Sequence, residues 1–154
     1  MMETNDILIK IEERKKLLST FDAMLDIDTC CMEFTKDILD YRKLGPTDGN
    51  LYKLIVSCSC AYAEIADKAY KIVESDKEEF MKTNMAVFPE SEDLKSIDVY
   101  DELRNFIASY QGLSSSIPEM SEKPIDKEEI VKLAKNIARV YSCILHHISG
   151  RGDE

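Results

Sequence analysis

A run of ten uncharged residues, at positions 54–63, constrains the fold of this chain more than any other feature. The run lies within a helical pattern over about residues 50–75, in which apolar side chains recur at helical spacing on two stripes. The first stripe consists of Leu51, Ile55, Cys58, Tyr62, Ile65, Ala69 and Ile72, and the second of Val56, Cys60, Ala63, Ala66, Tyr70 and Val73. A helix with two apolar stripes must be covered from two sides. We therefore predict that this segment is the central helix of a bundle.

Amphipathic patterns before the central segment predict two more helices. The first begins near Thr4 and is expected to bury one stripe against the bundle. That stripe consists of Ile7, Ile11, Leu18, Phe21 and Leu25. The pattern breaks at residues 26–29, where polar side chains can cap a second helix that ends before Gly45. The turn at residues 47–50 is short, so this second helix and the central helix should be antiparallel neighbours.

The chain after the central segment predicts a further long helix and up to two short ones before its last helix. Residues 76–85 either extend the central helix or form a short helix of their own. Ser91 should cap a longer helix that ends at Gly112. The connection over residues 113–124 is long for a compact domain, so it either lacks regular structure or holds one short turn.

The last helix carries the most regular pattern in the chain. Ile130, Ile137 and Ile144 recur every seven residues, which is typical of a helix that packs lengthwise against another. This stripe serves either the core or a homodimer through the C-terminal helix. Together the patterns predict a single all-α domain over residues 1–149, a bundle of five to seven helices, followed by a disordered tail at residues 150–154.

Charge and cysteine content restrict the function. The 154 residues include 30 Asp and Glu against 20 Lys and Arg, a formal net charge of -10. Such a chain repels phosphate backbones, so we expect no direct nucleic-acid binding. The N-terminus lacks a secretory signal pattern and the five cysteines form no paired framework, so we expect a cytoplasmic protein with reduced thiols. The uncharged run is half the length that a bilayer requires, so we expect no membrane contact.

One group of polar residues in the last helix is a candidate catalytic site. Arg139, Ser142 and His146 are spaced to share a helix face, which we expect to be the polar face opposite the heptad stripe. An Arg followed by six residues and a His resembles the motif of HEPN-type ribonucleases, which are small all-α proteins. The resemblance implies metal-independent RNA cleavage by Arg139 and His146, paired across a dimer. Val140 departs from the motif, because that family usually carries a polar residue there.

Carboxylates on two adjacent helices are the second catalytic candidate. Glu33, Asp37 and Asp40, followed by Glu64 and Asp67, are similar to the acidic pairs of all-α nucleotide pyrophosphatases. Around a turn near residue 47, however, only Glu33 lies level with Glu64, and the other carboxylates are roughly 10–15 Å away. We therefore expect no metal site at these residues.

Cysteine spacing argues against a zinc site as well. Cys58 and Cys60 point about 200° apart on one helix, so they cannot share an ion. Cysteine is usually buried as a small apolar residue, and we expect most of these thiols in the core. Cys143, near the expected polar side of the last helix, should be the most exposed thiol. We expect neither a metal nor a cofactor.

With no strong catalytic signature, the sequence favours a non-enzymatic protein-binding or regulatory module. Its expected docking face is an acidic helical surface for a basic partner, where complementary charge would speed association. The residues of this surface are Glu90, Glu92, Asp93, Asp98, Asp101 and Glu102. Inhibition of a basic or nucleic-acid-binding protein would use the same charge. The alternative is a HEPN-like ribonuclease that uses Arg139 and His146.

Overall fold

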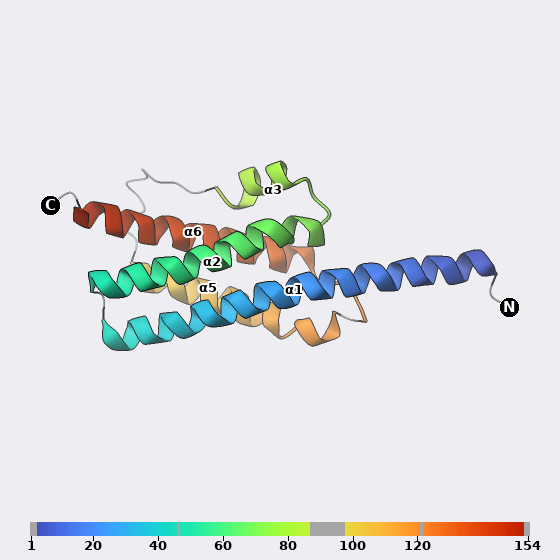
Figure 1. Ribbon diagram of the computed structural model, residues 1–154, viewed down its shortest axis with the longest axis horizontal. Helices are drawn as coiled ribbons and strands as arrows, with labels where there is room; N and C mark the ends of the chain where they lie inside the picture. Colours follow the sequence, from blue (N-terminus) through green and yellow to red (C-terminus); the bar gives the residue numbers. More distant parts are fainter. Residues whose placement is uncertain (1–2, 46, 87–97, 121, 153–154) are drawn as a thin grey trace.

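The computed structural model describes residues 3–45, 47–86, 98–120 and 122–152, and this part of the chain contains helices and their connections but no strand. Its helices, in chain order, are α1 (Thr4–Leu44), α2 (Asp48–Ile72), α3 (Lys77–Asn84), α5 (Val99–Ser114), the 3-10 turn η1 (Ile117–Glu119) and α6 (Lys127–Gly152) (Figure 1). The prediction of a single all-α bundle is confirmed. None of the helices in the described ranges combines the length and apolar composition needed to cross a bilayer.

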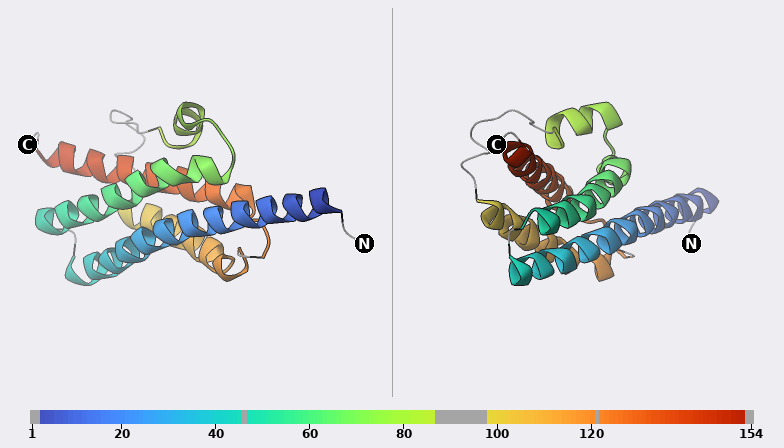
Figure 2. Two further views of the ribbon diagram at one scale, coloured as in Figure 1. Left: turned by 45° about the vertical axis from the view of Figure 1, so that its right-hand side comes forward. Right: turned by 60° about the vertical axis from the view of Figure 1, so that its left-hand side comes forward.

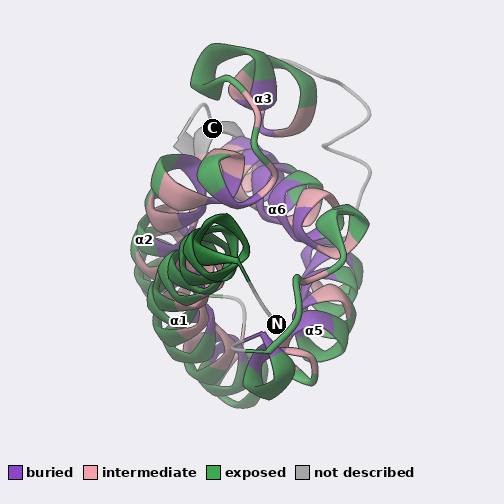
Figure 3. Cartoon of the chain, turned by 90° about the vertical axis from the view of Figure 1, so that its right-hand side faces the viewer, coloured by how far each residue is buried: buried purple, intermediate pink, exposed green. Residues whose placement is uncertain are grey.

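Four long helices surround the core in the order α1, α2, α6, α5 (Figure 3). Helix α1 packs mainly on α2, while α6 lies between α2 and α5. The short helix α3 packs on α2 and α6 at the edge of the bundle. The N-terminal part of α1 extends past the other helices in every view (Figures 1 and 2).

The predicted break at residues 26–29 is wrong, because α1 is one continuous helix of 41 residues. The polar side chains there are satisfied without ending the helix. The Thr29 hydroxyl donates to the Leu25 carbonyl at 3.0 Å, Asp28 accepts from the Tyr110 hydroxyl at 2.5 Å, and Asp26 pairs with Lys68. A single core stripe therefore passes through the expected break, formed by Met24, Ile27, Cys31, Phe34, Ile38 and Tyr41.

The stripe that we expected to be buried in the first helix is largely exposed. Ile7, Ile11, Leu18 and Leu25 are 45%, 44%, 43% and 40% exposed. The part of α1 before about residue 17 projects beyond the bundle, so no described helix covers it (Figure 2). Further along α1, the core-facing stripe occupies a different side of the helix from this one.

Helix α2 begins at a well-formed cap, since the Thr47 hydroxyl accepts from the Asn50 amide at 3.2 Å. The buried residues of its first stripe pack against α1 and α6, whereas the first half of its second stripe faces solvent. Val56 is 64% exposed, and Cys60 and Ala63 are exposed as well. Only one of the two expected apolar faces of α2 is therefore fully covered.

The C-terminal half differs from the prediction mainly at its ends. Residues 76–85 form the separate helix α3, and the predicted cap at Ser91 lies outside the described residues. Helix α5 continues through Ser114, two residues past the expected end at Gly112, and the connection after it contains the turn η1, with the side chains of Ile117 and Met120 buried. This connection is therefore packed against the bundle.

Helix α6 continues through Gly152, three residues beyond the expected end of the domain at residue 149. Its heptad residues Ile130, Ile137 and Ile144 are at most 1% exposed. Because these side chains belong to the core, the stripe is not open to a second copy of the chain. A homodimer through the C-terminal helix would have to use another face of α6, so that prediction stays untested.

Candidate functional site

The first candidate site is the polar group on α6 that resembles a ribonuclease motif. Ser142 and His146 are 0% and 6% exposed, so the expectation of a solvent-facing polar face is wrong. Helix α6 is covered by α5 as well as by α2, and this second neighbour buries the face beside the heptad stripe. The Ser142 hydroxyl donates to the Ala138 carbonyl at 2.8 Å, as a serine does inside a helix.

Arg139 is the residue of this group that reaches solvent, and it is already paired. Its Nε donates to Glu102 Oε1 at 2.7 Å, from a side chain that is 52% exposed to one that is 5% exposed. His146 Nε2 is buried without a hydrogen-bond partner in the described part of the chain. A catalytic pair must present both groups to one substrate. This arrangement instead makes Arg139 the counter-ion of a buried carboxylate.

The cysteines also differ from the prediction. Cys143 is buried, and its burial raises the pKa of the thiol to about 11. Cys31 and Cys58 are buried too, whereas Cys60 is exposed. As predicted, Cys58 and Cys60 point to different sides of α2, one into the core and one to the surface.

The predicted acidic surface is only partly described. Glu90, Glu92 and Asp93 lie outside the described residues. Asp98 is exposed but caps α5, where its side chain accepts from the Tyr100 amide at 2.9 Å, and exposed Asp101 pairs with Arg104. Glu102 cannot belong to any surface, because its side chain is buried against Arg139.

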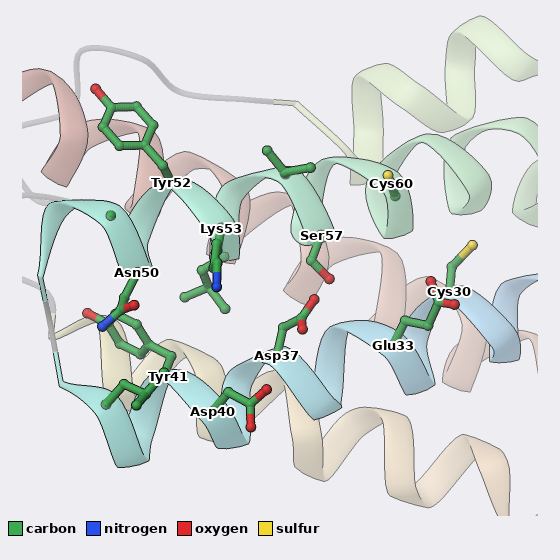
Figure 4. A pocket seen from close by; sticks show the side chains of 14 residues that line it. Cys30, Glu33, Asp37, Asp40, Tyr41, Asn50, Tyr52, Lys53, Ser57 and Cys60 are labelled. Atoms are coloured by element: carbon green, nitrogen blue, oxygen red, sulfur yellow. The ribbon is translucent and has the colours of Figure 1, made fainter.

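A groove with acidic side chains runs between the C-terminal half of α1 and the N-terminal half of α2 (Figure 4). It encloses about 640 Å³ and is open to solvent along one side. Two antiparallel helices form its walls because the connection at residues 45–47 is short. The wall on α1 carries Glu33, Asp37 and Asp40, and the wall on α2 carries Lys53, Ser57 and Cys60.

The side chains of the groove face one another across the two helices. Figure 4 shows the Asp37 carboxylate and the Ser57 hydroxyl pointing toward one another, and Lys53 reaching from α2 toward α1. Glu33 lies beside Cys30 at the inner end of the groove (Figure 4). The groove therefore combines three carboxylates on one wall with one ammonium group on the other.

None of these three carboxylates forms an ion pair within the described ranges, although nine other ion pairs are present there. Their positions, 33, 37 and 40, lie on one helix face. Exposed apolar side chains border the same groove, with Leu44 and Val56 each 64% exposed and Tyr52 57% exposed. The groove therefore presents acidic and apolar side chains next to one another.

The carboxylates of the two helices do not assemble a metal site. Glu64 pairs with Lys68, which also pairs with Asp26 on α1. Burial raises the pKa of the Cys30 thiol, and the Glu64 and Glu33 carboxylates raise it further. Glu33 and Glu64 therefore both lie near Cys30. No three His, Cys, Asp or Glu side chains within the described ranges are placed to hold a metal ion.

Comparisons of the chain with protein-family models, with curated proteins and with solved structures gave no match. The functional proposal therefore rests on the geometry of the bundle. The sequence contains a usable signal for the groove: Val56 and Cys60, on the second stripe of α2, lie opposite an acidic face of α1. From the sequence alone, these two residues indicate a second buried stripe on the central helix, and the carboxylates are judged only as a metal site for which they lie too far apart.

Proposed function

We propose that this protein is a non-enzymatic protein-binding module that holds a basic, amphipathic helical segment of a partner in the α1–α2 groove. The observation that carries the proposal is the set of carboxylates Glu33, Asp37 and Asp40 on one wall, which form no ion pair within the described ranges and are bordered by exposed apolar side chains. Carboxylates that have no ion-pair partner in the described part of the chain are available to Lys and Arg side chains of another protein.

The shape of the groove suits a helix. Two antiparallel helices present a continuous furrow, and a third helix can lay its apolar side in such a furrow while its charged side chains meet the rim. Val56 and Leu44 would contact apolar anchors of the partner, and Asp37 and Asp40 would meet basic residues one turn apart. Glu33 and Asp40 are exposed and Asp37 is partly exposed, so we expect these charges to act mainly on association rate and salt dependence.

The net charge of the chain supports the same class of partner. A formal charge of -10 attracts a basic protein over distances of about a Debye length and repels nucleic acid. A basic segment of a nucleic-acid-binding protein would be one such partner, and occupation of that segment would inhibit it. The burial of His146 and the pairing of Arg139 do not favour the ribonuclease alternative.

The proposal is tested with defined peptides. Purified full-length protein is titrated into a fluorescent basic amphipathic helical peptide, and into a peptide with the same apolar residues but Glu in place of Lys, while anisotropy is followed. We expect binding of the basic peptide alone, weakened by salt. Asp37→Lys with Asp40→Lys should weaken it at least tenfold.

The matched control reverses the same number of charges elsewhere. Glu12→Lys with Glu13→Lys changes net charge equally but lies on the projecting part of α1, away from the groove. If both double variants weaken binding equally, the attraction comes from net charge and the groove proposal is wrong. Incubation of the same protein with labelled RNA tests the alternative, and cleavage that is lost in His146→Ala would favour the ribonuclease.

A further inference from the structure

A second surface, the heptad stripe of α1, is built from five apolar side chains that no described helix covers. Its members recur every seven residues and are between 40% and 58% exposed: Ile11, Leu18, Leu25, Met32 and Leu39. Apolar residues at this spacing are typical of a helix that pairs lengthwise with another helix. The core of this bundle uses a different side of α1, through residues such as Met24 and Phe34.

We propose that the heptad stripe of α1 is a homodimer interface, in which the projecting part of α1 in each copy lies antiparallel along residues 19–32 of the partner's α1. Leu18 would contact the partner's Leu18 on the two-fold axis, and Ile11 would contact the partner's Leu25. The projecting parts are the accessible segments, because they extend past the bundle into solvent (Figures 1 and 2). Each copy would cover Ile11, Leu18 and Leu25 of the other.

Charge complementarity selects this register. Lys15 and Asp22 each follow a heptad residue by four positions, so both flank the stripe on the same side. An antiparallel pair centred on Leu18 brings Lys15 beside the partner's Asp22, and Asp22 beside the partner's Lys15. Among the described residues Lys15 pairs with Glu12 alone, at 3.7 Å, and this exposed contact contributes little. A parallel pair would place these flanks on opposite sides of the interface.

The size of the contact predicts a weak dimer. Residues 4–32 of each copy would overlap, roughly 43 Å of helix at about 1.5 Å per residue. A strip of that length and about 10 Å in width is small beside the ~800 Å² per partner of a standard interface. We therefore expect a concentration-dependent monomer–dimer equilibrium. The α1–α2 groove begins at about residue 30 on another face of α1, so the dimer does not depend on the proposed function.

Sedimentation velocity of the full-length protein over two decades of concentration tests this inference. We expect the sedimentation coefficient to rise with concentration in the wild type. Leu18→Glu places two carboxylates on the dyad and should leave only monomer. Val56→Glu is the matched control, because it makes the same kind of change at a 64% exposed residue of α2, and it should still dimerise. Far-UV circular dichroism checks that each variant is folded.

A charge exchange tests the antiparallel register. Asp22→Lys should weaken the dimer at least fivefold, and the double variant Lys15→Asp with Asp22→Lys should restore it. A wild type that stays monomeric at every concentration would overturn the inference, as would a dimer that survives Leu18→Glu or is lost in Val56→Glu. Failure of the double variant to restore dimerisation would overturn the antiparallel register.

Discussion

The Arg139–Glu102 pair joins α6 to α5, and its removal gives the sharpest test of whether Arg139 has a structural role. In Arg139→Ala the Glu102 carboxylate would keep its buried position, 4% exposed, but lose its partner at 2.7 Å. Its other oxygen, Oε2, already lacks a hydrogen-bond partner in the described part of the chain. The variant therefore leaves a buried carboxylate without any protein donor there.

The expected loss of unfolding free energy in Arg139→Ala lies between two limits. Breaking a fully buried ion pair costs about 3–5 kcal/mol, whereas an exposed pair contributes about 0.2–1 kcal/mol. Glu102 is buried but the Arg139 side chain is 52% exposed, so water screens part of the interaction. We expect Arg139→Ala to lower the free energy of unfolding by about 2 kcal/mol, or to lower Tm by roughly 4–8 °C in a domain of this size.

Urea unfolding followed by far-UV circular dichroism at neutral pH measures this loss. Arg104→Ala is the matched control, because Arg104 pairs with Asp101 on the surface, where the two side chains are 64% and 57% exposed. We expect that control to change stability by less than about 0.5 kcal/mol. Adding Glu102→Leu to Arg139→Ala removes the uncompensated carboxylate and should recover most of the lost stability.

Equal stability of Arg139→Ala and Arg104→Ala would refute the reasoning, because it would show that the buried carboxylate needs no counter-ion. A failure of Glu102→Leu to recover stability would locate the loss in the packing of the arginine stem instead. Neither result is expected from the geometry of the pair.

Three further predictions concern single side chains, namely Cys60, Tyr110 and Tyr62. A thiol reagent at neutral pH should modify Cys60 rapidly and spare Cys143 until the protein unfolds, and Cys60→Ser should remove the fast reaction. Tyr110→Phe should lower the free energy of unfolding by about 1–2 kcal/mol in a urea titration, because the Asp28 carboxylate loses a hydrogen bond of 2.5 Å. Burial and the contact with Asp28 raise the pKa of Tyr110 above 10.0, so the wild type should lose stability as pH rises past that value, and the variant should lose less. Tyr62→Phe removes the 2.6 Å hydrogen bond to the carbonyl that ends α3, and limited proteolysis should then cut faster near that helix.

Local patterns predicted the helical class and most core positions, because helical spacing and capping act over a few residues. Five of the seven residues in the first stripe of α2 are buried, and the three isoleucines of the α6 heptad are buried as well. These positions follow from periodicity alone, whatever neighbours the helix has.

The continuity of α1 could not be predicted in this way. Asp26 and Asp28 can cap a helix or lie inside one, and the choice here depends on Lys68 and Tyr110. Those partners are 42 and 82 residues away in the chain. The burial of the polar group on α6 could not be predicted for the same reason. His146 is buried because α5 packs on α6, and the pattern of α6 itself does not show this.

The unbroken α1 also joins two regions of very different local stability. Its C-terminal half is fixed by the core, whereas the first dozen residues form a helix of about three turns whose side chains are all exposed. A helix of that length is marginal in water without tertiary contacts. Amide protection should therefore fall steadily from Phe34 toward Thr4 along one helix. Any molecule that binds the N-terminal end of α1 must also order it. The observed binding free energy will therefore be the free energy of the new interactions less the free-energy cost of ordering this part of the helix.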